Sequence, residues 1–210
     1  MSDIVVHYFD LYGRAEVIRI LLHYVGVPFT DHRVQFSEWP EVKVSGLAEF
    51  GQLPVVDIDG LRLAQTRSIV RYLCQKYNLY TSNPQDIYWI ESLCDLIDDM
   101  QMYIANFFWT KDEEGLKKTF SDKIPDWLQK IEARLERNNA GQGFFVGDHP
   151  TNADFFVFSF LYNYILVESP DIFDLNAPKV KQWMTRLIES SQSLKTYLET
   201  RVPSSYYYKG

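Results

Sequence analysis

The pattern of apolar residues divides this chain into two regions that meet near residue 78. Before that point, short β-rich runs alternate with amphipathic helical stretches in the order β-α-β-α-β-β-α. After it the strand pattern almost disappears and helical periods dominate. Strands this short do not suit a large doubly wound sheet. We therefore predict an α/β domain over residues 1–78, a linker over 79–86 and an all-helical domain over 87–210.

The start of the α/β domain combines a strand pattern with a helical one. Ile4 to Phe9 is β-rich and carries no charge, which is typical of a buried strand. Gly26 and then Pro28 are expected to end the helix that follows, since glycine favours the C-terminal cap and proline cannot continue a helix. The inner face of that helix is predicted to be Val17, Ile18, Leu21, Leu22 and Val25.

A hairpin is the clearest signal in the rest of this domain. Thr30 to Val34 is predicted to be a strand, and Trp39 to Gly46 a short helix. The pair Asp59-Gly60 separates the apolar runs Val55 to Ile58 and Leu61 to Leu63, which is a strong hairpin pattern. The domain should close with a helix whose inner face is Ile69, Val70, Leu73 and Tyr77.

The second domain shows helical stripes only. Ile87 to Trp109 is predicted to be one long helix, and a second stripe runs from Ile124 to Leu135. Thr151-Asn152-Ala153-Asp154 resembles a capping box that opens an apolar helix through Val167. Two further helices are predicted from the stripes Val180, Trp183, Met184 and Leu187, and Leu194, Tyr197 and Leu198.

Charge and cysteine content narrow the class of protein. The net charge is −7, with no basic run, which argues against nucleic acid or an anionic membrane as partner. The chain starts with Met-Ser-Asp and moves directly into a strand-like run, so we expect no signal peptide. Cys74 and Cys94 show no metal or redox spacing and are expected to fill helix faces in a reduced cytoplasmic compartment.

Three places in the first domain carry residues suited to chemistry. Tyr8 stands near the end of the first strand, just before a turn that leads into the first helix. Leu53-Pro54 precedes the third strand, where a cis proline would suit a tight entry. Gln65-Thr66 is expected at a helix N-terminus, with Thr66 as a cap, where unpaired N–H groups and the helix dipole favour a carboxylate.

These residues and the runs around them resemble the cytosolic glutathione transferases. The similarity is closest to the sigma class, which includes glutathione-dependent prostaglandin D synthases and squid-lens crystallins. It implies a thioredoxin-like first domain that binds glutathione, and a helical domain that offers a second substrate. The runs that carry it are Tyr8-Phe9-Asp10, Gly13-Arg14-Ala15-Glu16, Trp39-Pro40-Glu41-Val42-Lys43, Gly51-Gln52-Leu53-Pro54-Val55, Gln65 to Leu73, Gly147-Asp148 and Thr151 to Asp154.

The resemblance implies a role for each matching residue. Tyr8 would donate a hydrogen bond that holds the glutathione sulfur as thiolate, and Arg14 would add positive potential there. Asp99 would receive the γ-glutamyl ammonium of glutathione bound to the neighbouring subunit, so the active unit would be a homodimer. The remaining glutathione contacts would come from Trp39, Lys43 and Gln52 at the glycine end, from Leu53 and Pro54 at the cysteinyl unit, and from Gln65 and Thr66 at the γ-glutamyl carboxylate.

Several features of the sequence allow two interpretations. Asp95, Asp98 and Asp99 share one helix face and match a trio that binds a divalent metal in the prostaglandin D synthases, but a solvated acidic face is an equal alternative. Phe156 and Phe160 are spaced as core residues, or they line the second-substrate pocket. Tyr206 to Tyr208 form a tail or cover that pocket. The four histidines, His7, His23, His32 and His149, are interpreted as structural.

The leading hypothesis is a glutathione transferase that acts on electrophilic, mostly hydrophobic small molecules, with isomerase or peroxidase activity as a variant. The alternatives are a non-catalytic crystallin-like protein and a carrier of hydrophobic ligands with the same fold. A thiol-disulfide oxidoreductase is disfavoured, because no cysteine or serine lies between Asp3 and Phe36 to act as a nucleophile. The sequence does not identify the electrophile.

Overall fold

The computed structural model describes residues 4–166 and 169–202, and these form two compact units. The first unit contains the chain up to Tyr77 together with the C-terminal segment from Ser191, and the second runs from Asn78 to Ser190. Tyr206 to Tyr208 lie outside the described residues.

A four-stranded mixed sheet forms the centre of the first unit. Its strands are β1 (Val5–Phe9), β2 (Thr30–Val34), β3 (Val55–Ile58) and β4 (Leu61–Ala64), in the order β2-β1-β3-β4. β1 runs parallel to β2 and antiparallel to β3, as the β-α-β and hairpin patterns predict. The hairpin turn places Asp59 and Gly60 at φ values of 53° and 75°, the region that an Asp-Gly turn requires.

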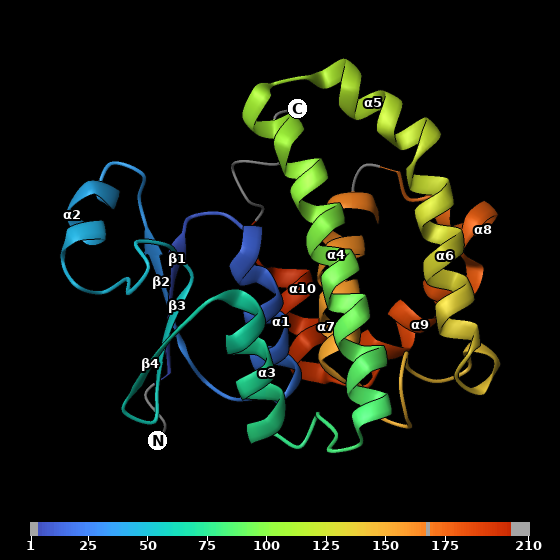
Figure 1. Cartoon of the computed structure of the whole chain (residues 1–210), viewed down its shortest axis with the longest axis horizontal. Helices are drawn as coiled ribbons and strands as arrows, with labels where there is room; N and C mark the ends of the chain where they lie inside the picture. Colours follow the sequence, from blue (N-terminus) through green and yellow to red (C-terminus); the bar gives the residue numbers. More distant parts are fainter. Residues whose placement is uncertain (1–3, 167–168, 203–210) are drawn as a thin grey trace. The chain divides into compact units, whose positions relative to one another are not determined.

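Helices cover both sides of this sheet. α1 (Glu16–Tyr24) and α3 (Thr66–Lys76) lie on one side, and α2 (Trp39–Val44) lies on the other (Figure 1). The side chains between β1 and the two longer helices are apolar and fully buried, which places the core of the unit directly behind Tyr8. This core includes Val6, Ile18, Leu21, Leu22, Ile69, Val70 and Leu73.

The last helix, α10 (Gln192–Thr200), groups with the first unit, whereas the sequence assigned it to the helical domain. It packs on α1, where the Ser191 hydroxyl donates to the Tyr24 carbonyl at 2.9 Å. The Tyr197 hydroxyl donates to Glu16 at 2.8 Å. A helical period by itself does not tell which apolar core the helix covers.

The second unit is helical, and beyond Ala64 the described residues contain no strand. Its longest helix begins at Pro84, three residues before the predicted start, because the Asn83 side chain caps it by accepting from the Gln85 N–H. The linker before this helix is therefore three residues shorter than predicted. The helices are α4 (Pro84–Thr110), α5 (Glu113–Asp122), α6 (Ile124–Glu136), α7 (Asn152–Phe160), α8 (Ile172–Asn176) and α9 (Pro178–Glu189).

The predicted capping box is present at the start of α7. The Thr151 N–H donates to the Asp154 carboxylate at 2.8 Å, and the Trp183 indole of α9 donates to the same group at 3.0 Å. Phe156 and Phe160 are 3% and 2% exposed and belong to the buried core of this unit. The π-helical turn Leu161–Leu166 follows.

Both cysteines of the chain are buried. Cys94 is buried in α4, and Cys74 is buried in α3 of the first unit, so both fill helix faces as expected.

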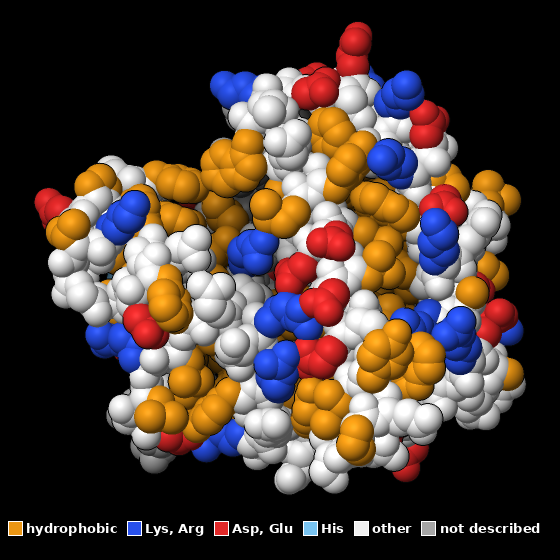
Figure 2. All heavy atoms as spheres, in the orientation of Figure 1, with side chains coloured by type: hydrophobic (Ala, Val, Ile, Leu, Met, Phe, Trp, Pro, Cys, Tyr) orange, Lys and Arg blue, Asp and Glu red, His pale blue; other side chains and the backbone are white. Residues whose placement is uncertain are grey.

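On the face in Figure 2, basic and acidic side chains are interspersed. Among the described residues no helix combines the length and the apolar character that crossing a membrane would take. Two short helices, α5 and α8, were not predicted, because neither has a long apolar stripe.

Candidate functional site

The Tyr8 side chain points to the buried face of β1 and is 7% exposed. Its hydroxyl oxygen accepts a hydrogen bond of 3.0 Å from the backbone N–H of Arg14. A hydroxyl that already accepts from the backbone keeps its own hydrogen for another acceptor. Tyr8 is therefore an oriented donor at the end of the strand.

Gly13 makes this approach of the turn to Tyr8 possible. Its φ of +44° is strained for residues with a side chain, and an added Cβ would lie 2.6 Å from the Tyr8 hydroxyl and 2.5 Å from Leu11. The 3-10 turn Gly13–Ala15 then brings the Arg14 N–H to the phenol oxygen. A glycine at this position is thus required by both backbone conformation and space.

The surroundings of Tyr8 keep its phenol protonated. Burial raises the pKa of Tyr8 above its ordinary value of 10.0, and this outweighs the N–H of Arg14 and the charges of Arg14 and Arg19, which lower it. At neutral pH the group is a neutral O–H donor. The nearby positive charges favour any anion that accepts from it.

Helix α2 carries Trp39 and Lys43, and the segment before β3 brings Gly51 next to Lys43. Trp39 contacts the ring of Phe9 edge to face, with centroids 5.3 Å apart, so it is held against the end of β1. The Lys43 side chain runs along Gly51, where an added Cβ would lie 3.3 Å from Lys43 Cε. The ammonium of Lys43 remains exposed at this edge.

Gln52, Gln65 and Thr66 meet at the N-terminus of α3. Gln65 Nε2 donates to Gln52 Oε1 at 3.1 Å. Gln65, with φ of 70°, is the N-cap residue but its side chain makes no capping bond, and Thr66 is the first helical residue instead of the predicted cap. Within the described residues the Thr66 hydroxyl is buried and has no hydrogen-bond partner. These uncapped donors suit a carboxylate ligand.

Leu53 and Pro54 connect this group to the sheet. The Leu53-Pro54 peptide bond is cis, as predicted. Both residues are buried, and the following Val55 pairs with His7 of β1. The arrangement places the main chain of Leu53 directly before β3, between Gln52 and the strand that lies next to Tyr8.

Comparison with known proteins gives the family of this arrangement. Residues 4–75 match the family model of the glutathione S-transferase N-terminal domain, and residues 98–201 match that of the C-terminal domain. Glutathione S-transferase 2 of Manduca sexta is 32% identical over 206 residues, which cover 95% of this chain and 97% of that protein. The chain belongs to the glutathione S-transferase family.

Other relatives agree with this family. The hematopoietic prostaglandin D synthase of Homo sapiens is 28% identical, over 86% of this chain and 87% of that protein. A pi-class glutathione S-transferase of Onchocerca volvulus superposes with a TM-score of 0.87 at 26% identity, covering 95% of this chain and 93% of the other. A sigma-class enzyme of Fasciola hepatica gives 0.82 at 25% identity, covering 96% and 97%.

Asp99, the remaining predicted contact in this transferase, lies in the second unit on an exposed position of α4. Its role toward a neighbouring subunit stays a prediction. Within the described part of the chain, no group of three or more Asp, Glu, His or Cys side chains is arranged to hold a metal ion, and this includes Asp95, Asp98 and Asp99.

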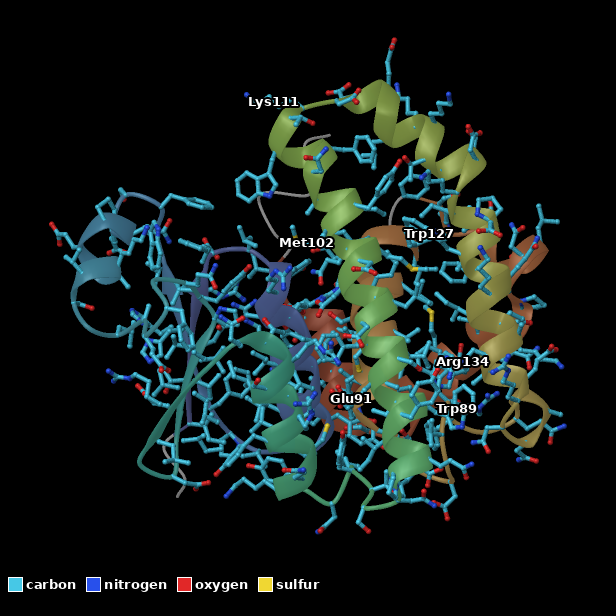
Figure 3. The ribbon with its side chains drawn as sticks, in the orientation of Figure 1. Trp89, Glu91, Met102, Lys111, Trp127 and Arg134 are labelled. Carbon is cyan, nitrogen blue, oxygen red and sulfur yellow. The ribbon has the colours of Figure 1, made fainter. Side chains whose placement is uncertain are left out.

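Helix α4 also carries aromatic and apolar side chains at its surface. Trp89 is covered by the guanidinium of Arg134 from α6, at 4.7 Å from its ring (Figure 3). Met102 and Trp109, further along α4, are 55% and 64% exposed. Trp89 is thus a packing contact, whereas Met102 and Trp109 offer apolar surface.

Sequence reasoning did not identify a group of buried charges beside Tyr8. Arg19 and Glu16 on α1 are almost completely buried and contact each other at 3.2 Å. The helical period places both residues on the face opposite the predicted inner face, so no local pattern indicated that they are buried; in the structure every residue from Glu16 to Leu22 is buried.

Proposed function

We propose that this glutathione S-transferase family member binds glutathione in its first unit and stabilises the thiolate for attack on hydrophobic electrophiles. The observation that carries this proposal is the Tyr8 hydroxyl, which accepts from the Arg14 N–H at 3.0 Å and stays protonated. The sulfur of glutathione would accept the remaining O–H hydrogen. The thiol proton would pass to solvent when the thiolate forms, and a sulfur electron pair would then make the carbon–sulfur bond. The electrophile would release a leaving group with its bonding pair or, at a conjugated double bond, take up a proton from solvent.

One hydrogen bond of this kind is large enough for the task. An ordinary thiol has a pKa of about 8.5, so lowering it by about two units takes about 2.7 kcal/mol. A hydrogen bond to a charged group contributes about 1.5–3 kcal/mol. The charge of Arg14, which already lowers the pKa of Tyr8, would add to the stabilisation of an adjacent thiolate.

The other residues of the site would hold the two ends of the tripeptide. The uncapped N-terminus of α3 with the buried Thr66 hydroxyl suits the γ-glutamyl carboxylate. The exposed ammonium of Lys43 beside Trp39 suits the glycine carboxylate, and Gln52 lies between the two through its bond to Gln65. Leu53 would pair its main chain with the cysteinyl unit.

The remaining features extend the proposal to the second substrate and the assembly. Met102 and Trp109 provide exposed apolar surface on α4 for a hydrophobic electrophile. We infer a cytoplasmic homodimer in which Asp99 contacts glutathione of the neighbouring subunit. Sedimentation should give a dimer at micromolar concentration, and a fully active monomer would contradict this assembly.

The test is the ultraviolet absorbance of the thiolate in the glutathione complex, measured against pH for the natural protein and Tyr8→Phe. The Phe variant loses one hydrogen bond and keeps the ring, so glutathione affinity should change little. The midpoint should rise by about one to two pKa units, at about 1.36 kcal/mol per unit. Turnover near neutral pH should fall about 10- to 100-fold and recover at higher pH. An unchanged midpoint would assign the sulfur to another group, with Arg14 the first candidate.

An isomerase that uses glutathione is the second candidate, since a prostaglandin D synthase is among the relatives. A panel of conjugation substrates beside a prostaglandin endoperoxide would separate the two activities. A crystallin-like or carrier protein would bind glutathione without lowering its thiol pKa, and the same titration identifies that result.

A further inference from the structure

A buried ionic network connects the C-terminal helix to the Tyr8 site. Glu16 is 1% exposed and accepts from three groups at once. Arg19 Nη1 donates to it at 3.2 Å, the Tyr197 hydroxyl at 2.8 Å and Arg201 Nη1 at 2.5 Å. Tyr197 belongs to α10 and Arg201 directly follows it, so two of the three donors come from a segment more than 180 residues away.

Arg19 connects this network to the turn that precedes Arg14. Its Nη1 donates to the carbonyls of Leu11 and Tyr12 at 3.0 and 3.4 Å, the residues just before Gly13 and the Arg14 N–H. Its guanidinium carbon lies 5.9 Å from the centroid of the Tyr8 ring. Within the described residues its Nη2 is buried without a hydrogen-bond partner. Arg19 therefore contacts the turn and lies near the face of the ring.

Charges of both signs surround Arg19, and their balance decides the potential at Tyr8. Asp31 of β2 accepts from Arg19 Nε at 2.9 Å and is shared with Arg33. Arg201 forms an ion pair with Glu16, and its guanidinium carbon lies 4.3 Å from the centroid of the Tyr12 ring. Without Arg201, the Glu16 charge would act fully on Arg19 and cancel more of the positive potential that reaches Tyr8.

We propose that Arg19 is a positioning residue for Tyr8, and that α10, through Tyr197 and Arg201, keeps Arg19 in place and maintains the positive potential at the Tyr8 hydroxyl. The inference rests on the proposed function and deepens it. It makes the C-terminal helix part of the thiolate-stabilising machinery, with Arg201 and Tyr197 acting through Glu16 and Arg19.

Other titratable groups near the network do not change state in the range of interest. His23 of α1 stacks on Tyr197 with centroids 4.0 Å apart. Burial lowers the pKa of His23 below its ordinary value of 6.5, although Glu16 and Asp31 oppose the shift, so it is neutral above that pH. Glu16 and Asp31 keep the pKa of Arg19 above its ordinary value despite burial, and the charge persists throughout. A shift seen between pH 6.5 and 9 therefore reports the thiol.

The experiment measures the thiolate midpoint of bound glutathione in Arg201→Met, Arg201→Lys and Tyr197→Phe. Arg201→Met removes a positive charge and should raise the thiolate midpoint by about half to one pKa unit. Charges in partly buried surroundings interact with an effective dielectric constant near 20. Arg201→Lys should bring the midpoint most of the way back. Tyr197→Phe, which removes a bond and no charge, should shift it by about a third of a unit or less.

Arg186→Met is the matched control. Arg186 lies in the second unit, where it donates to the carbonyls of Gly141 and Gly143 at 2.8 and 3.1 Å. Its loss should lower the melting temperature without moving the midpoint. If Arg201→Met lowers the melting temperature and leaves the midpoint unchanged, the network is a structural clamp only and the inference is overturned. If Tyr8→Phe also leaves the midpoint unchanged, the role proposed for Tyr8 fails independently of the network, because another group then holds the sulfur.

Discussion

Each unit contains a buried carboxylate, Glu16 in the first unit and Asp154 in the second. These two carboxylates accept hydrogen bonds from different kinds of donor. Asp154 accepts from neutral donors only: the N–H groups of Thr151 and Phe145, the Thr151 hydroxyl and the Trp183 indole. Glu16 accepts from two arginines and a tyrosine. Neutral donors satisfy one carboxylate through local hydrogen bonds, whereas arginine partners bring charges of their own, which also act on the groups beside them.

This difference separates a structural role from a functional one. Burial raises the pKa of Asp154 to about 6, even though all four donors favour its charged form. Its partners hold the start of α7 against α9, and none of them lies in the first unit. The Glu16 network instead borders the turn that positions Tyr8. Mutations in the two networks should therefore have different readouts.

The largest effect is expected for Asp154→Ala. The change leaves the buried N–H groups of Thr151 and Phe145 and the Trp183 indole without an acceptor, so the free energy of unfolding should fall by about 3–5 kcal/mol. Urea denaturation measures it, with Asp126→Ala as an exposed control. The thiolate midpoint of the folded variant should match that of the natural protein. A shifted midpoint would show that the two networks are not separate.

Gly13→Ala should affect both stability and chemistry. The added Cβ would meet the Tyr8 hydroxyl at 2.6 Å in a backbone conformation that alanine rarely adopts. We expect a stability loss of about 1–3 kcal/mol, together with a higher thiolate midpoint. Gly60→Ala is the control, because Gly60 also has positive φ but has no atom within 4 Å of an added Cβ. If both variants lose stability and neither changes the thiolate midpoint, Gly13 has no role at Tyr8.

The two units should respond to acid with opposite sign. The pKa of His23 is lowered by burial, so the unfolded chain takes up this proton first and the first unit loses stability as pH falls below about 6.5. The pKa of Asp154 is raised to about 6 from 3.8, so its contribution to stability is present at low pH and is lost as pH rises through about 6.

Hydrogen exchange corrected for intrinsic rates, at pH 7 and pH 5, measures this difference. Protection in α1 and α10 should fall by about 1 kcal/mol or less, while protection in α7 and α9 should hold or rise. The His23→Gln variant should remove part of the response of the first unit. Equal losses in both units would contradict the assignment of the two groups.

The smallest effect is expected for Lys130→Ala. Its pair with Asp126 at 2.6 Å is an exposed i, i+4 contact on α6, where solvent screens the attraction. The free energy of unfolding should change by no more than about 0.5 kcal/mol. A larger loss would mean that exposed ion pairs contribute as much to the free energy of unfolding as the buried Glu16 and Asp154 networks.

Local patterns predicted much of the fold of both units. The Asp59-Gly60 turn, the Thr30–Val34 strand and the Thr151 to Asp154 capping box are confirmed as predicted. The structure also brings Gln52 next to Gln65 and Lys43 next to Gly51, while the roles of these residues toward glutathione stay predictions. The start of α4 and the cap of α3 were wrong, because helix ends depend on single side-chain bonds that a period does not contain.

The sequence by itself determined where the chain forms strands, turns and helices, because those depend on dihedral preferences and hydrogen bonds within a few residues. It also indicated Tyr8 and Gly13 as a turn at the end of a strand. Only the tertiary structure decided that α10 packs on α1 and that Arg201 meets Glu16. Contacts between residues 185 positions apart depend on which apolar faces cover one another, and buried charges such as Arg19 follow from that packing, which no local pattern encodes.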